Sequence, residues 1–433
     1  MDARGRSNND PSSRPRSKSM RKTVDRLGSA QSFGADLLCA IFALLDHSDL
    51  VRCSAVCKSW CKIICTSTLI EDLYYRKNPY AKYDKSLPQA SISMLKDLAL
   101  EQHSLSFLSG STEIQQWNGH SSRVNLCRMK RGVILTGGED KLLRLWSAES
   151  YKCLNEYSLS GLDPLVDYDF DENKIVGMTG SQVCIWRRNG GKSIFRSHES
   201  TLIRGLCMGY IDPEAAIGCE DGRARIFDMY SGSCTRIIRI HSAPVTCIAL
   251  TEDQLILCGS TSGHVAITDI SSGERLGFLK ASTSPTGMKT LFVNTSSHRV
   301  YAGSTSGHAH CWDLRTLRLL WETRASPNVI YSVRHLASDS SELAVGGLDG
   351  VLRILNQNTG EVLSSFVADS GQINSTTNLG VVEAIEGRAL AEDTNIDSIP
   401  RYRRPPITCL AVGMKKIVTT HRGKYIRMWK FSK

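Results

Sequence analysis

The 433-residue chain lacks the segments that would direct it into or across a membrane. No run approaches the roughly 18 uncharged apolar residues that indicate a transmembrane helix. The polar N-terminus contains no apolar core of the kind that a secretory signal needs. We therefore expect the protein in the cytoplasm, the nucleus or both, where its 15 cysteines would remain reduced thiols.

The chain also lacks the short motifs that mark several enzyme classes. It contains no phosphate-binding Gly-rich motif, no Gly-x-Ser-x-Gly and no His-Glu-x-x-His. No other arrangement of residues points to a reaction. The sequence therefore predicts a protein without catalytic residues and without a cofactor.

Two groups of metal-binding residue types have simpler interpretations. Four cysteines recur every four residues, which is helical spacing and not the Cys-x-x-Cys pairing of structural zinc sites. They are Cys53, Cys57, Cys61 and Cys65. We expect them to pack as small apolar side chains. His308 and His310 share one face of a predicted strand and are interpreted as structural or solvated, so no metal site is predicted.

Positive charge is concentrated at the N-terminus. The net charge is +10, and eight Lys/Arg against three Asp in residues 1–30 supply half of it. This segment is rich in Ser, Asn, Pro and Arg and poor in apolar residues, so we predict a disordered basic tail over residues 1–32. The basic stretch 14–22 is compatible with a nuclear-import or nucleic-acid patch and with an ordinary solvated tail. We regard a nucleic-acid partner as the less favoured interpretation.

A unit of alternating apolar runs repeats from about residue 118. Each unit contains a small-residue run that ends in Gly, then a tight turn, then a second alternating run. Asp-Gly and Ser-Gly pairs at these turns favour β-hairpins, because Gly adopts positive φ without strain. The second run ends at equivalent positions: Trp146, Trp186, Phe227, Thr268, Trp312, Leu355 and Trp429. The last spacing is much longer than the others, which predicts an insertion at about 367–406.

These units resemble WD repeats. The likeness is carried by Gly119-His120, by Trp312-Asp313 and by an Asp six places before the terminal aromatic position. Asp140, Asp221 and Asp349 occupy that position. In WD repeats a hydrogen-bonded structural tetrad fixes the turn, and one such tetrad is complete in this chain. It comprises His120, Thr136, Asp140 and Trp146. The resemblance therefore implies that His120 and Asp140 are structural and not a catalytic pair.

The ends of the repeat region predict how a ring of blades closes. The last unit stops directly after its third strand, near residue 433. Residues 111–117 read as a strand without inner partners of its own. In WD-repeat proteins such a segment completes the last blade and removes an open sheet edge. We therefore expect a seven-bladed propeller over residues 111–433. Within the insertion, residues 378–387 favour a short helix and residues 401–406 an extended basic linker.

A small helical segment precedes the repeats. Its apolar residues form a stripe at helical spacing: Leu37, Ile41, Leu45, Leu50, Val56 and Trp60. So short a segment cannot build an independent core and is expected to bury the stripe against a partner. The segment 33–68 resembles an F-box at these positions, although the usual opening Leu-Pro is replaced by Phe33-Gly34. Residues 69–110 favour a helical spacer.

The order of the two modules implies a function. An F-box followed by WD repeats is similar to the substrate receptors of Skp–cullin–F-box ubiquitin ligases. The resemblance implies a mainly β fold, a Skp-family adaptor and through it a cullin as partners, and an unknown protein target on the propeller. An alternative function is a scaffold that binds protein or RNA independently of ubiquitination. No membrane partner is expected.

The alignment of the units also suggests where a target binds. Turns at one end of the propeller present charged residues that have no role inside a blade. They are Arg123, Glu139, Arg204, Glu220, Lys289 and Arg422. Four of the six are basic, which favours an acidic or phosphorylated target, because Arg binds phosphate with paired hydrogen bonds. Ordinary solvated charges are the competing interpretation.

Overall fold

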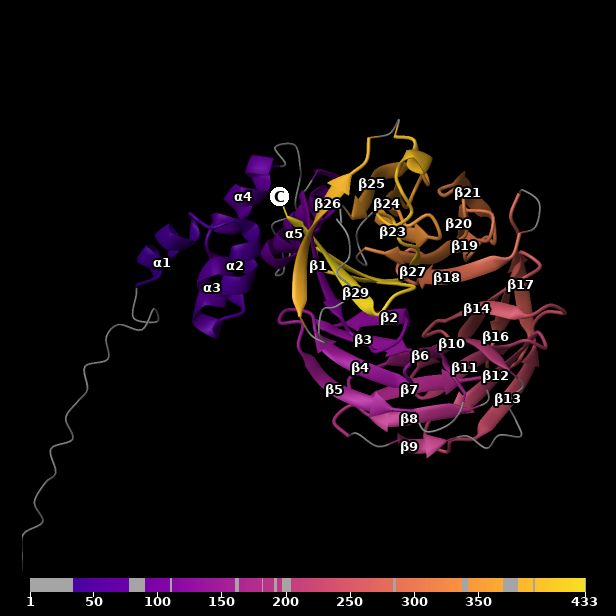
Figure 1. Ribbon diagram of the computed structural model, residues 1–433. Coiled ribbons are helices and arrows are strands. Elements are labelled where there is room, and N and C mark those ends of the chain that lie inside the picture. The colour runs from indigo at the N-terminus through magenta and orange to yellow at the C-terminus, as the bar shows by residue number, and fades with distance from the viewer. Residues whose placement is uncertain are drawn as a thin grey trace, which may run out of the picture. The chain divides into compact units, whose positions relative to one another are not determined.

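The computed structural model describes most of the chain in several stretches (Figure 1). These are residues 34–77, 90–109, 111–159, 163–180, 182–190, 193–196, 204–282, 286–336, 342–368, 381–391 and 394–432. The predicted basic tail lies outside them. The chain divides into two units, residues 1–96 and 97–433. None of the helices within the described stretches combines the length and the apolar character that crossing a membrane requires.

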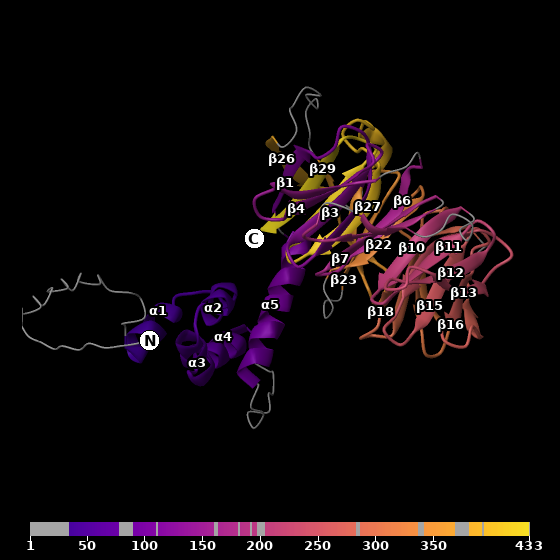
Figure 2. The ribbon, with the colours of Figure 1, turned by 90° about the horizontal axis from the view of Figure 1, so that it is seen from below.

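The first unit contains short helices that pack on one another. They are α1 (Ala35–Phe42), α2 (His47–Ser54), α3 (Lys58–Thr66) and α4 (Leu69–Lys77). Helix α3 contacts each of the other three, as Figure 2 shows. Asp46 caps α2, because its side chain accepts a hydrogen bond from the Asp49 N–H at 2.8 Å. Helix α1 has Gly34 at its N-cap and therefore no side-chain cap.

Each of these helices buries one face and exposes the other. Leu38 and Phe42 of α1 are buried, and the Phe42 ring lies 5.2 Å from the ring of Trp60 in an edge-on contact. Leu50 of α2 and Ile64 of α3 are fully buried beside them. The four regularly spaced cysteines do not share one helix, since Cys53 lies on α2 and Cys57 is the N-cap of α3.

The second unit consists mainly of antiparallel strands. Helix α5 (Ala90–Ser109) spans the boundary between the units. The first two four-stranded sheets contain β2 (Val124–Lys130), β3 (Val133–Gly138), β4 (Leu142–Ser147) and β5 (Cys153–Ser158), and then β6 (Leu165–Phe170), β7 (Lys174–Thr179), β8 (Val183–Arg187) and β9 (Ser193–Arg196). The next two contain β10 (Gly205–Ile211), β11 (Glu214–Cys219), β12 (Arg223–Asp228) and β13 (Cys234–Arg239), and then β14 (Val245–Leu250), β15 (Leu255–Ser260), β16 (Val265–Asp269) and β17 (Arg275–Leu279). The fifth contains β18 (Met288–Asn294), β19 (Arg299–Ser304), β20 (His308–Asp313) and β21 (Leu319–Arg324).

The remaining strands form one nine-stranded sheet in the order β22-β23-β24-β25-β26-β1-β29-β28-β27. Its members are β1 (Ser111–Asn118), β22 (Ile330–His335), β23 (Glu342–Gly347), β24 (Leu352–Asn356), β25 (Val362–Ala368), β26 (Val382–Ala389), β27 (Ile407–Gly413), β28 (Lys416–His421) and β29 (Tyr425–Ser432). The inserted strand β26 pairs with β1 along its length and with the end of β25. Because this sheet joins what the sequence treats as the last two units, the count of seven blades stays a prediction.

The sheets follow one another around a common axis (Figure 1). Their innermost strands contact each other in the order β2, β6, β10, β14, β18, β22 and β27, and β27 contacts β2 again. Apolar clusters fill the space between neighbouring sheets; one of them joins Leu135 and Tyr157 to Tyr168 and Trp186 of the next sheet. The predicted fold class, mainly β after a small all-α segment, is confirmed.

The innermost strands share one irregularity. In each of them the pairing with the second strand skips a residue directly after the first paired residue. The skipped residues are Asn125, Val166, Leu206, Thr246, Lys289, Tyr331 and Thr408. A β-bulge bends its strand and redirects the local side chain. The repeated bulge therefore turns one side chain of every inner strand away from the regular alternation.

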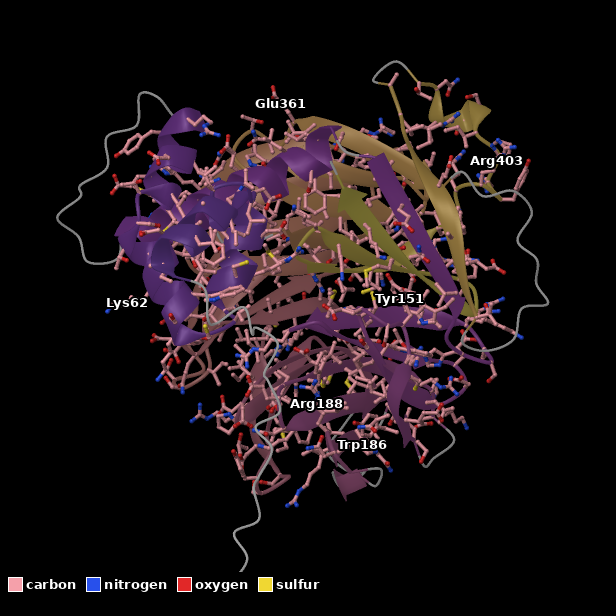
Figure 3. The ribbon with its side chains drawn as sticks, turned by 90° about the vertical axis from the view of Figure 1, so that its left-hand side faces the viewer. Lys62, Tyr151, Trp186, Arg188, Glu361 and Arg403 are labelled. Atoms are coloured by element: carbon pink, nitrogen blue, oxygen red, sulfur yellow. The ribbon has the colours of Figure 1, made fainter. Side chains whose placement is uncertain are left out.

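The structure corrects two predictions for the insertion. Residues 378–387 were expected to be helical, but 378–380 lie outside the described stretches and 382–387 belong to β26. Flanking strands supply hydrogen-bond partners on both sides, and this tertiary context overrides the local helix preference. Residues 401–406 were expected to be an extended linker, but they form a turn with Arg404 buried. Arg403 is exposed on this turn, 5.9 Å from the Tyr402 ring (Figure 3).

The guanidinium of buried Arg404 donates hydrogen bonds to backbone carbonyls. Its Nε donates to the Ile399 carbonyl at 2.8 Å, and its Nη1 donates to the Asp349 carbonyl at 3.1 Å. A buried guanidinium needs such partners to offset its lost hydration. The basic stretch therefore fastens the end of the insertion to the loop before β24.

Deleting residues 111–117 tests the role of β1. The deletion removes the strand that pairs with both β26 and β29, so two sheet edges lose their partner. We expect a lower melting temperature with a less cooperative transition, or aggregation in light scattering. Glu113→Ala alters an exposed residue of the same strand and should leave both measurements unchanged. An unaltered melting curve of the deletion variant would contradict this role.

Candidate protein-interaction surfaces

The structure brings the four tetrad residues together in one hydrogen-bonded chain. The Nδ1 of His120 lies 2.9 Å from Oδ1 of Asp140, and its Nε2 lies 2.9 Å from Oγ1 of Thr136. The Nε1 of Trp146 donates to the same Thr136 hydroxyl at 2.8 Å. The chain links the loop before β2 to strands β3 and β4. It satisfies buried polar groups and offers no open position for a substrate.

An arginine that sequence reasoning missed completes this arrangement. Arg144 Nη1 lies 3.1 Å from Oδ2 of Asp140. Burial opposes the ionisation of Asp140, but hydrogen bonds from His120 and the Ser121 N–H and the charge of Arg144 outweigh it, so the pKa of Asp140 lies well below its ordinary value. The carboxylate is therefore ionised and pairs with buried donors.

The same ion pair recurs wherever the turn Asp is present. Arg225 lies 2.9 Å from Asp221, and Arg353 lies 2.6 Å from Asp349. In each pair the arginine follows the aspartate by four residues, so an Asp-x-x-x-Arg pattern is the sequence signal that could have revealed it. The pairs hold the turn against the third strand of the sheet.

Units without the Asp use other polar groups. Ser306 Oγ lies 2.9 Å from Nδ1 of His308, and the Ser262 hydroxyl lies 2.6 Å from that of Ser260. The last sheet contains a chain that sequence reasoning missed, because its histidine stands at a different position. His421 Nε2 lies 3.0 Å from Thr419 Oγ1, which accepts a hydrogen bond from Trp429 Nε1 at 2.9 Å. Burial lowers the pKa of His421 well below its ordinary value.

All six predicted target-binding residues are exposed. Arg123 and Glu139 flank the hairpin of β2 and β3, where the Glu139 N–H donates to the Arg123 carbonyl at 2.8 Å. Arg204 and Glu220 flank the hairpin of β10 and β11 with the same backbone hydrogen bond, at 3.1 Å. Each pair therefore lies where an inner strand begins and the second strand ends, which is the same end of both sheets.

The other two residues reach this end by different routes. Lys289 is the bulged residue of β18, and Arg422 follows β28 and donates to the Tyr331 hydroxyl at 3.2 Å. Tyr331 is the bulged residue of β22, so the repeated bulge contributes to this end of the ring. The guanidinium of Arg204 lies 3.6 Å from Glu220. Within the described residues, no carboxylate forms an ion pair with the other three basic side chains.

A cavity of about 360 Å³ occupies the middle of the ring, bordered by the inner strands. Arg128 Nη2 donates to Asp167 Oδ1 at 2.9 Å, while Oδ2 of Asp167 accepts from the Met208 N–H at 3.0 Å. Arg128 Nη1 also lies 3.6 Å from Sγ of Cys409. A hydrogen bond from the Cys127 side chain, together with the charges of Arg128 and Arg334, holds the pKa of Cys409 well below its ordinary value despite burial. These contacts connect β2 to β6, β10 and β27.

The predicted adaptor-binding residues of the first unit differ in exposure, and only some of them lie on its surface. Leu37, Ile41 and Val56 are 50%, 40% and 62% exposed, and Leu45 is half-buried. Leu50 is fully buried, so the structure does not place it on the exposed stripe that the sequence predicted.

Trp60 also departs from the predicted stripe, because it packs against Phe42 and is only partly accessible. Leu44 and Val51, which sequence reasoning did not select, are 87% and 39% exposed. We call the five exposed large apolar side chains among residues 34–77 the apolar set: Leu37, Ile41, Leu44, Val51 and Val56. Leu37 and Ile41 lie on α1 and Val51 lies on α2. Leu44 lies between α1 and α2, and Val56 lies between α2 and α3.

Comparisons with known proteins match both units. The F-box-like family model matches residues 35–76, and the model of the WD domain, G-beta repeat, matches residues 111–147. A third model, the N-terminal domain of nucleolar protein 10-like proteins, matches residues 199–383. The first match ends in α4, so it includes a helix that the sequence assigns to the spacer.

An F-box/WD-40 repeat-containing protein of Arabidopsis thaliana is 42% identical over 93% of this chain and 95% of its own length. Autophagy-related protein 16 of the same organism is 21% identical over 54% of this chain and 47% of its own length. The computationally designed Ika8 protein has a similar fold, with a TM-score of 0.52 at 13% identity, over 73% of this chain and 98% of its own. An F-box with WD repeats supports a substrate-receptor role in general.

Asp140→Asn tests the buried ion pair. The substitution leaves Arg144 and His120 without their anion, so we expect a loss of about 3 kcal/mol in the free energy of unfolding. The pKa of Asp140 is lower in the folded than in the unfolded chain, where it is about 3.9. Its contribution is therefore full at neutral pH and is lost as the pH falls through the folded value.

Denaturant titrations of both proteins at several pH values measure this difference. It should be constant near neutrality and should shrink below about pH 4. Glu149→Gln, a charge removal at an exposed loop position, should cost little. A wild-type unfolding free energy for Asp140→Asn at pH 7 would rule out the ion pair as a stabilising contact.

Proposed function

The chain belongs to the F-box/WD-40 repeat proteins, and we propose that it is the substrate-recognition subunit of a Skp–cullin–F-box ubiquitin ligase. In this function the helical unit binds a Skp-family adaptor and the propeller binds a protein target. The chain itself contributes proximity and orientation to ubiquitin transfer, which other subunits perform.

The observation that carries the proposal is the apolar set on the helical unit. A small unit with its own buried centre has no internal reason to leave five large apolar side chains exposed. Exposed apolar side chains concentrated in so short a segment favour a protein-binding surface, whereas scattered single ones would not. Leu50 and Trp60 support the surface from behind, because they hold α1, α2 and α3 together. The missing Leu-Pro affects the start of α1 and leaves the apolar set intact.

The target is proposed to bind the end of the propeller that presents the six charged residues. Arg123, Lys289 and Arg422 have no ion-pair partner within the described residues, whereas Arg204 is partly neutralised by Glu220. The surface thus favours an acidic or phosphorylated target, although less strongly than a count of four basic residues suggests.

Leu37→Lys and Ile41→Lys test the adaptor interface. Burying such a side chain contributes about 1.5–3 kcal/mol, so each substitution should lower adaptor affinity about tenfold or more. The measurement is calorimetry of the full chain with purified Skp-family adaptor. Leu154→Lys is the matched control, because Leu154 is also 50% exposed but belongs to strand β5. Unchanged affinity of both F-box variants would refute the ligase assignment.

The scaffold alternative makes a different prediction for the intact cell. Affinity capture with the proteasome blocked, using the full chain and a form without residues 33–65, should recover the same targets with both forms. Only the full chain should recover adaptor and cullin, and in cells without the proteasome block only the full chain should shorten the lifetime of the targets. Equal target lifetimes with both forms would favour the scaffold.

Arg123→Glu with Arg204→Glu tests the target surface. Reversing two charges at one end of the propeller should lower recovery of bound targets about tenfold while adaptor affinity stays at the wild-type level. Quantitative mass spectrometry of captured proteins provides the measurement. Arg315→Glu changes an exposed arginine in the turn after β20 and serves as the control. An unchanged set of targets would place recognition elsewhere on the propeller.

A further inference from the structure

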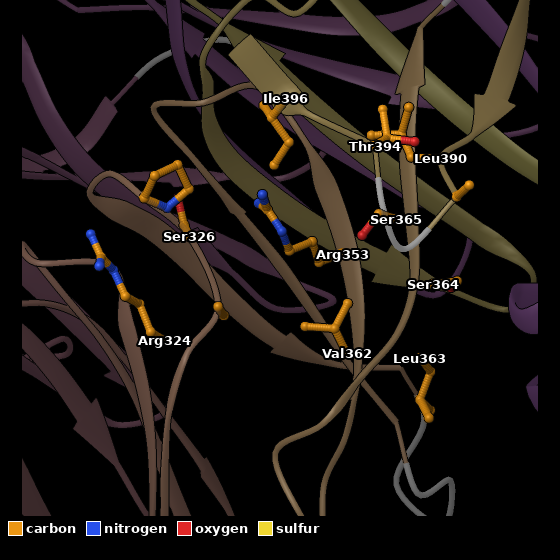
Figure 4. A pocket seen from close by; sticks show the side chains of 13 residues that line it. Arg324, Ser326, Arg353, Val362, Leu363, Ser364, Ser365, Leu390, Thr394 and Ile396 are labelled. Atoms are coloured by element: carbon orange, nitrogen blue, oxygen red, sulfur yellow. The ribbon is translucent and has the colours of Figure 1, made fainter. Parts of the chain in front are cut away.

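A second hollow of the propeller lies on its outer side, where residues 325–327 lead into an inner strand, and so lies beside the charged end. It has a volume of about 510 Å³ and is bordered by β24, by β25 and by the segments that follow β21 and β26 (Figure 4). Arg353 of β24 and Arg324 of β21 both line it. We call this hollow the β25 groove.

Arg353 differs from Arg144, the equivalent arginine of the first sheet; Arg225, the third of this kind, faces Ile237 and does not line the β25 groove. Arg144 and Arg353 both follow a turn aspartate by four residues and both pair with it. Arg144 has a second anionic partner, because its Nε donates to Glu156 at 2.8 Å from the cross-strand position on β5. The cross-strand position of Arg353 on β25 is Ser365.

Among the residues that the structure describes, the guanidinium of Arg353 therefore lacks the second carboxylate that Arg144 has. The side chain is only 5% exposed, and within the described residues Asp349 is the one carboxylate with which it forms an ion pair. A guanidinium carries five N–H donors, and a buried donor without an acceptor destabilises a protein. In the first sheet a carboxylate occupies the corresponding place; in this sheet the β25 groove occupies it.

The rest of the lining combines a second cation with apolar surface. Arg324 is exposed at the end of β21. Val362 and Leu363 of β25 are 39% and 38% exposed, and Leu390 and Ile396 line the groove from the segment after β26. Figure 4 shows Arg353 between Ser326 and Ser365. A single acidic side chain flanked by apolar residues matches this lining in charge and polarity.

We propose that the β25 groove binds a short acidic segment of a target protein, with one glutamate or aspartate carboxylate on Arg353 in the place that Glu156 takes on Arg144. Arg324 attracts the segment, and its apolar residues pack on Val362 and Leu363. The groove is a second contact for the target beside the charged end of the propeller. The inference rests on the proposed function only for the source of the segment.

An array of eight-residue peptides tests the groove with purified full-length chain and without adaptor. Each peptide has a central glutamate between apolar residues, and a matched array has glutamine at that position. We expect a subset of glutamate peptides to bind at least about tenfold more tightly than their glutamine partners. The absence of any such preference would overturn the proposal, as would binding that requires phosphoserine in place of glutamate.

Ser365→Glu gives the sharpest test, because it supplies the missing carboxylate from within the chain. The new side chain stands opposite Arg353 as Glu156 stands opposite Arg144. The variant should fold with an undiminished melting temperature and lose the preference for glutamate peptides. Retention of that preference in a folded Ser365→Glu protein would show that the peptides bind elsewhere.

Arg324→Glu should reduce the affinity of the selected peptides about tenfold. Arg239→Glu is its matched control, because Arg239 is exposed at the last position of β13, as Arg324 is at the last position of β21. Equal losses in both variants would indicate a non-specific charge effect and contradict the groove. Adaptor affinity, measured on the same proteins, reports separately on the proposed function.

Discussion

The pairing of β1 with β29 is the interaction on which the rest of the propeller depends. A ring of sheets has two chain ends that must meet, and an unpaired end exposes a row of backbone hydrogen-bonding groups. Here the first strand of the second unit pairs in full with the last strand of the chain, Ile114 opposite Trp429. The inserted β26 covers the other edge of β1 and continues into β25. Closure therefore uses three segments that are far apart in the sequence.

The backbone of the sheets repeats around the ring, but the polar side chains that form hydrogen bonds at the turns differ from sheet to sheet. The first sheet uses a complete tetrad, the last uses His421 with Thr419 and Trp429, and two middle sheets use serines. In each of these groups, buried hydrogen-bond donors have acceptors. Arg353 has a serine where Arg144 has a carboxylate at the cross-strand position, and this difference coincides with a groove.

The helical unit and the propeller differ in the kinds of side chain that they expose. The helices bury Leu38, Phe42, Leu50 and Ile64 among themselves, yet they leave the apolar set outside. The sheets bury apolar clusters between neighbours and present charged residues at one end. One unit thus offers an apolar surface and the other a charged surface, which suits two partners of different character.

Repetition and helical spacing let the sequence alone determine the mainly β fold, the F-box position and the tetrad, because these depend on residues within one unit. It could not separate Leu50 from Ile41 or Val56, since all lie at helical spacing and only packing decides which face is inside. The strand at β26, the repeated bulge and the β25 groove depend on neighbours distant in the chain. Tertiary structure decided them, because pairing across sheets outweighs local preference.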